Sequence, residues 1–121
     1  DLVINHVLPA AKRYQKMLLE KVANVKMVFD AEEAKALNEQ DCLLIRRIEA
    51  HASAIIAGVD KMTKLRVIAN HIDNQRERAL AFHDTVVPIM EEIRKHVDEL
   101  EMWVDDQLWT LPKYRELLFI R

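Results

Sequence analysis

Apolar side chains recur every three or four residues along three long stretches of this sequence. The stretches cover residues 2–29, 32–72 and 75–106. Because this spacing keeps apolar side chains on one side of an α-helix, it predicts three long helices that pack along narrow apolar seams. A polar run at residues 70–75 is expected to hold the second turn. Asp30 is a good N-cap for the second helix, and Glu33 three residues later predicts a capping box.

Each predicted helix has its own seam. The first seam consists of Ile4, Leu8, Ala11, Leu18, Val22, Val25 and Phe29, with Gln15 as its polar interruption. The second consists of Leu37, Leu44, Ile48, Ile55, Met62, Leu65 and Ile72, and it is widened by Cys42, Ile45, Ile56 and Val59. The third consists of Phe82, Val86, Ile89, Ile93, Val97, Leu100 and Val104. The wider stripe predicts that the second helix, about 60 Å long if unbroken, contacts two neighbours.

Prolines and the single glycine interrupt these patterns. Pro9 and Pro88 each remove an amide donor and crowd the preceding turn, so we expect a kink or a break at each, which would raise the helix count to four or five. Gly58 predicts either a weak point in the second helix or the close approach of a neighbouring backbone. Leu111-Pro112 is expected to end the third helix, and a last short helix is expected at residues 113–118.

The composition fits a helical fold and argues against several classes of function. The chain has one glycine among 121 residues, half of its residues are apolar, and its net charge is −2. So little glycine leaves few tight turns and no glycine-rich phosphate loop. The two signs of charge are interleaved, so no nucleic-acid partner is predicted, and no apolar run is long enough for a membrane partner. We predict one all-α domain over residues 1–121: an antiparallel bundle of three long helices plus a short C-terminal helix.

Candidate catalytic chemistry is sparse. None of the five histidines has an acid three residues before it, as di-metal carboxylate helices require, and no two are four residues apart. His51 lacks the lysine and glycine that usually follow a phosphate-accepting histidine. Cys42 lies in an apolar stripe, and Ser53 lies in a helix interior without a strained turn to present it. We therefore predict no catalytic, cofactor-binding or metal-ligating residue.

Two surfaces are candidates for binding a partner protein. Asp98, Glu101 and Asp105 fall on one face of the third helix, which forms an acidic face. Aromatic side chains gather near the C-terminus of a chain that is only 6% aromatic, and aromatic side chains commonly anchor interfaces. The candidate interface residues of this aromatic tail are Trp103, Trp109, Leu111, Tyr114, Leu117, Leu118 and Phe119.

The same tail resembles a known family. The run DQLWTLPKYRELLF at residues 106–119 is similar to the C-terminus of type III glutamine synthetases. The segments at residues 86–94 and 98–101 resemble the helix that precedes this tail in the family, and LPAAKRYQ at residues 8–15 resembles the helix that follows its catalytic region. The matches occur in family order and bracket nearly the whole chain.

The resemblance implies a helical C-terminal domain cut from a longer enzyme, which also fits a chain that begins at Asp1 inside a helical pattern. The parent enzyme would condense glutamate with ammonia, using ATP and Mg²⁺ or Mn²⁺ bound in upstream regions. No catalytic residue is carried over, so this fragment is expected to be no enzyme and to hold no cofactor. Its expected partners are the catalytic domain and the other subunits of a dodecamer. A single cysteine, without an internal disulfide, fits a cytoplasmic protein.

Two other functions stay open at this point. A stand-alone helical scaffold or adaptor would bind an unrelated partner through the acidic face or the aromatic tail. A small helical enzyme or metal carrier would need a site that the sequence motifs do not reveal.

Overall fold

The computed structural model describes the backbone of residues 2–119 and the side chains of residues 4–104. Its elements are α1 (Leu2–Val28), α2 (Ala31–Asn70), α3 (Gln75–Ala81), the π-helical turn η1 (Phe82–Val86) and α4 (Val87–Phe119). The part of the chain that is described contains helices and turns and no strand. The predicted all-α fold is therefore confirmed.

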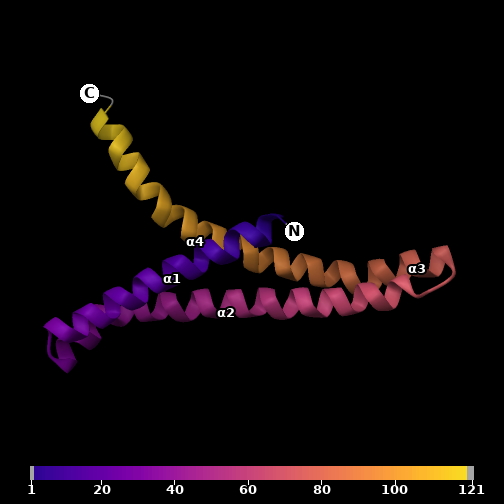
Figure 1. Cartoon of the computed structure of the whole chain (residues 1–121), viewed down its shortest axis with the longest axis horizontal. Helices are drawn as coiled ribbons and strands as arrows, with labels where there is room; N and C mark the ends of the chain where they lie inside the picture. Colours follow the sequence, from indigo (N-terminus) through magenta and orange to yellow (C-terminus); the bar gives the residue numbers. More distant parts are fainter. Residues whose placement is uncertain (1, 120–121) are drawn as a thin grey trace.

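The helices form an elongated, antiparallel arrangement (Figure 1). α1 and α2 make a hairpin at one end, and α2 runs to the other end, where the chain turns back through α3 and η1 into α4. α2 contacts both α1 and α4, and α1 also contacts α4. Three helices pack together only in the middle of the molecule, because α1 is much shorter than α2.

Side-chain caps fix the starts of two helices. The Asp30 side chain accepts a hydrogen bond from the Glu33 amide at 2.8 Å, as the sequence predicted for the start of α2. At the second turn, Asn74 accepts from the amides of Arg76 and Glu77 at 2.9 and 3.1 Å and caps α3. Each acceptor satisfies amides that have no partner inside the helix, so the two turns stay short.

The prolines act differently from one another. α1 runs through Pro9 without ending. Just before Pro88 the helix widens into η1, where the Val87 amide donates to the Phe82 carbonyl five residues back, and the Thr85 hydroxyl donates to the Ala81 carbonyl at 2.6 Å. The predicted interruption near Pro88 is thus a π turn.

The expected end of the third helix at Leu111-Pro112 is wrong, because α4 continues to Phe119. The segment expected as a separate short helix at residues 113–118 is joined to α4. A proline removes only one amide donor, so a helix pattern can continue on both sides of it.

The core lies where α1, α2 and α4 meet. Its buried members are Val7, Ala11, Leu18, Ile48, Ile55, Ile93, Val97, Leu100 and Val104. The predicted seams of the first and third helices are largely confirmed by this set. Within the second seam, Ile48 and Ile55 are buried as predicted.

The predicted seam is wrong near the start of α2. Leu37 is 56% exposed, whereas Ala34 and Asn38 are buried. The Asn38 amide group donates to the Val22 carbonyl of α1 at 3.2 Å. Apolar periodicity misses this contact, because the residues that face α1 here are a small one, Ala34, and a polar one, Asn38. Phe29 and Ile56, which were also assigned to the seams, are exposed.

Candidate interaction surfaces

A row of polar and aromatic contacts joins α2 to α4. The Nδ1 atoms of His51 and His96 lie 2.9 Å apart, with ring centroids 5.1 Å apart. Further along, the Arg47 guanidinium carbon lies 5.3 Å from the centroid of the Trp103 ring, which is a cation–π distance. The Trp103 indole N–H also donates to Glu99 at 3.4 Å. These contacts are internal, so their first effect is to hold the two helices together.

The histidine pair constrains its own protonation. In a hydrogen bond between two Nδ1 atoms, one ring donates and the other accepts, so at least one imidazole is neutral while the bond exists. Sequence reasoning missed this pair, because the two histidines are 45 positions apart and only the helix register brings them together. Across the described residues, no three histidine, cysteine or acidic side chains gather closely enough to hold a metal ion.

The predicted aromatic tail is only partly visible. Trp103 is half-buried and packs within the bundle. The side chains of the other six candidate interface residues lie outside the described residues: Trp109, Leu111, Tyr114, Leu117, Leu118 and Phe119. On the acidic face, Asp98 pairs with Arg94 at 3.5 Å, and the side chain of Asp105 also lies outside the described part.

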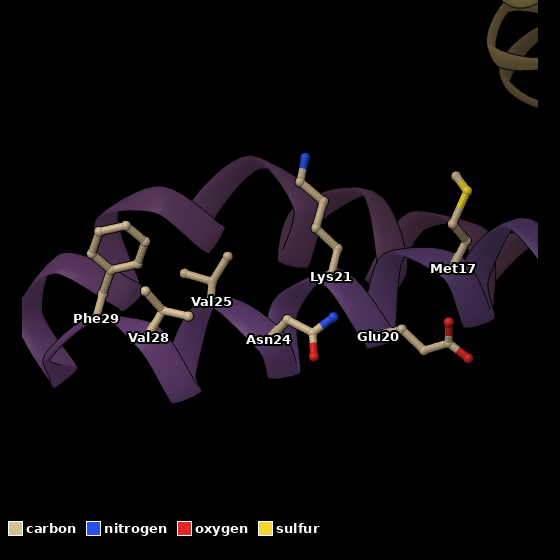
Figure 2. A pocket seen from close by; sticks show the side chains of 7 residues that line it. All are labelled: Met17, Glu20, Lys21, Asn24, Val25, Val28 and Phe29. Atoms are coloured by element: carbon tan, nitrogen blue, oxygen red, sulfur yellow. The ribbon is translucent and has the colours of Figure 1, made fainter.

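An apolar groove of about 410 Å³ lies along α1 near the α1–α2 turn. Its apolar lining residues are Met17, Val25, Val28 and Phe29, and its polar ones are Glu20, Lys21 and Asn24. Figure 2 shows the two valines and Phe29 gathered at one end and Met17 at the other. We call Met27, Val28 and Phe29 the α1-end patch. Met27 is 83% exposed and Val28 is 75% exposed, although both are large apolar side chains.

The opposite end of the molecule also exposes apolar side chains. Val67 and Ile68 near the end of α2 and Leu80 in α3 are all more than half exposed. We call these three residues the α3-end patch. Sequence reasoning missed both patches. It assigned Phe29 to the first seam, and the other side chains lie beside the seams and look like ordinary helix residues in a periodic pattern. Large apolar side chains exposed in groups typically mark contact surfaces.

A more enclosed pocket of about 400 Å³ lies where α1, α2, η1 and α4 meet. We call it the central pocket. Its apolar lining residues are Ile4, Met62, Phe82, Met90, Ile93 and Val97. Two arginines, Arg66 of α2 and Arg94 of α4, complete the lining.

A polar cluster joins α1 to α2. Lys12 Nζ lies 2.8 Å from a Glu49 carboxylate oxygen, and Gln15 donates to the same oxygen at 2.9 Å. These hydrogen bonds and the charge of Lys12 hold the pKa of Glu49 below its ordinary value. Nearby, burial raises the pKa of Tyr14, and the charge of Asp41 raises it further.

No model of a protein family matches the chain. A glutamine synthetase of Bacteroides fragilis is 46% identical over all 121 residues. A type-3 glutamine synthetase of Dictyostelium discoideum is 28% identical, again over the full chain. The predicted resemblance is confirmed: the chain is related to glutamine synthetases.

The chain spans only about a sixth of these glutamine synthetase relatives, 17% of the first and 16% of the second. The similarity covers all of the helices described above, including both exposed patches and the central pocket. In the described part of the chain, no helix is long and apolar enough to cross a membrane.

Proposed function

We propose that this chain is a non-catalytic structural domain of a type III glutamine synthetase. It packs on the catalytic part of the same enzyme and stabilises the oligomer that the enzyme forms. The whole enzyme would make glutamine from glutamate, ammonia and ATP in the cytoplasm, with Mg²⁺ or Mn²⁺ held by residues outside this segment. In this proposal the helical domain supplies contact surface and leaves the chemistry to the rest of the protein.

The observation that carries the proposal is the exposure of large apolar side chains at both ends of the bundle. Single exposed apolar residues are common, but Met27 and Val28 are adjacent in the chain, both are at least three-quarters exposed, and Val28 lines an apolar groove. The glutamine synthetase relatives are about six times longer than the chain. A longer protein offers the surfaces that would cover these patches.

The polar contacts of the described residues support a structural role. The Lys12–Glu49 ion pair joins α1 to α2, and the His51–His96 pair joins α2 to α4. These side chains are engaged with one another across helix interfaces. They serve the packing of the bundle, which is what a supporting domain requires.

The test uses a full-length enzyme that carries this segment, with Met27→Gln and Val28→Gln combined. Both side chains are exposed, so the isolated chain should keep its helix content and thermal midpoint. When the enzyme is diluted, the assembled variant should dissociate at a higher protein concentration than the parent enzyme does. Light scattering after size-exclusion chromatography measures the size of the oligomer. Ile56→Gln is the matched control, because Ile56 is also more than half exposed and lies near the middle of α2, away from both ends.

A second pair of variants tests the tail predicted from the sequence. Trp109→Ala and Tyr114→Ala should each weaken assembly by about 2–4 kcal/mol if these aromatic side chains are interface anchors. The proposal is contradicted if the enzyme that lacks the whole segment keeps the oligomer size, the thermal stability and the specific activity of the parent.

A further inference from the structure

The central pocket has the dimensions of a small-molecule site. Its volume of about 400 Å³ falls in the range of about 300–1,000 Å³ that is usual for such sites. Its lining comes from four separate elements: Ile4 of α1, Met62 of α2, Phe82 of η1 and Met90 of α4. Residues this far apart in the sequence line one hollow only when the bundle is folded, so the site belongs to the native structure.

The charge of the pocket is one-sided. Among the residues whose side chains the structure describes, its charged lining residues are Arg66 and Arg94, and none of its lining residues is acidic. Both arginines are exposed, so their guanidinium groups lie at the edge of the apolar hollow, as long charged side chains commonly do. Arg94 contacts Asp98 through Nε, which leaves its terminal nitrogens for a ligand. Among the described residues, Arg66 has no acidic partner within ion-pair distance.

The π turn gives independent support. Phe82, the first residue of η1, is half-buried and lines the pocket. Such turns are rare because the helix must widen to accommodate an extra residue, and they are frequent at functional sites. Here the widening lies where Phe82 enters the pocket.

We propose that the central pocket binds a small apolar molecule that carries one carboxylate. The apolar body would lie against the aliphatic side chains and Phe82, and the carboxylate would accept hydrogen bonds from Arg66 and Arg94. A guanidinium group matches a carboxylate in shape and charge and donates two parallel hydrogen bonds. Other grooves fit this ligand less well. The groove along α1, for example, has both Glu20 and Lys21 in its lining.

This inference goes beyond the structural role proposed above and does not depend on it. A ligand that bridges α1, α2, η1 and α4 would stabilise the folded bundle, because it binds the native state and has no site on the unfolded chain. Occupancy of the pocket would therefore change how firmly the helices of the domain pack together.

The experiment titrates the 121-residue chain with octanoate and, separately, with octanol, which has the same apolar body without the charge. Methyl resonances of Ile4, Met62 and Met90 report the location of binding by NMR. Octanoate should shift these resonances in a saturable manner and bind about tenfold more tightly than octanol. At ten times its dissociation constant it should raise the thermal midpoint by about 3–8 °C.

Arg66→Gln combined with Arg94→Gln should reduce octanoate affinity about tenfold or more and leave octanol binding unchanged. Arg13→Gln with Arg76→Gln is the control that removes the same charge from exposed positions outside the pocket. Met90→Trp should block both compounds by filling the hollow, with helix content checked by circular dichroism. The proposal is overturned if octanoate and octanol bind equally, if the control loses as much affinity, or if the pocket methyl groups do not respond.

Discussion

Gly58 of α2 and Ile93 of α4 lie so close together that there is no room for a side chain between them. A Cβ atom placed on Gly58 would lie 2.7 Å from Ile93 Cγ1 and 3.2 Å from Cδ1. Ile93 is buried, so the contact can be relieved only if its side chain shifts toward the central pocket that it also lines. The one glycine of the sequence therefore marks a close approach of the two long helices, and α2 passes through it without a break.

Replacing Gly58 by alanine should destabilise the chain. Alanine favours a helix by about 1 kcal/mol over glycine, but overpacking a helix interface costs about 1–3 kcal/mol. A non-bonded contact of 2.7 Å is closer than carbon atoms of separate residues normally approach, so we expect the steric cost to exceed the helix gain. Urea denaturation followed by circular dichroism measures the balance.

Ile93→Ala provides the double-mutant cycle for this prediction. On its own it leaves a cavity, but together with Gly58→Ala the new methyl group has space. The double variant should therefore lose less stability than the sum of the two single losses. Thr63→Ala at an exposed position of α2 serves as the control for helix propensity. If Gly58→Ala stabilises the chain as much as Thr63→Ala does, the close contact with Ile93 does not affect the free energy of unfolding.

The His51–His96 hydrogen bond should contribute measurably to the α2–α4 interface. His96→Ala and His51→Ala should each reduce the free energy of unfolding by about 1 kcal/mol, since a half-buried hydrogen bond is lost. The double variant should lose little more than either single one, because both changes remove the same bond. His83→Ala is the control: His83 is exposed, and the polar contact of its ring is with its sequence neighbour Asp84 and not with another helix. Fully additive losses would contradict a direct interaction.

Much of the fold followed from periodicity, because long amphipathic helices leave few alternatives. The seams of α1 and α4 were predicted well, since these helices bury one narrow stripe against two neighbours. The start of α2 was not predicted well, because a polar residue, Asn38, is buried there and its side-chain nitrogen donates to the Val22 carbonyl. The periodicity argument takes account only of apolar residues, so it placed Leu37 in the interior. The π turn before Pro88 was predicted only as an interruption.

The candidate sites were harder to predict than the fold. The central pocket depends on where the start of α1 lies against α2, η1 and α4, and no local pattern encodes that placement. Arg66 and Arg94 look like ordinary surface residues in the sequence, and they share a pocket only after two helices align. The tail residues were predicted as an interface from the gathering of aromatic side chains near the C-terminus, and the family resemblance of the same run carries no physical account of what they contact.

The cap of α2 should be worth about 1 kcal/mol. Asp30→Ala removes the acceptor of the Glu33 amide and leaves that amide without a partner in the helix. Asp30→Asn should retain most of the stability, because asparagine caps about as well as aspartate. The two variants are compared by thermal and urea unfolding. Equal losses from both would assign the effect to the charge of Asp30 and not to its hydrogen bond.

Glu49 gives the chain a predictable response to acid. Its pKa is lowered in the folded state by hydrogen bonds from Lys12 and Gln15 and by the charge of Lys12. The ionised carboxylate therefore stabilises the folded state at pH values above the ordinary pKa of 4.5. This contribution is lost as the pH falls through 4.5 toward the lower value of the folded protein.

Glu49→Gln should remove that part of the pH dependence, whereas Glu39→Gln, at an exposed position of α2, should leave it in place. Because Glu49 is exposed to solvent, the effect should be modest and should shrink as salt is added. Urea unfolding at several pH values between about 3 and 7 follows the ionisation of carboxylates and gives the comparison. Identical pH profiles for the parent and Glu49→Gln would show that the Lys12–Gln15–Glu49 cluster does not couple to folding.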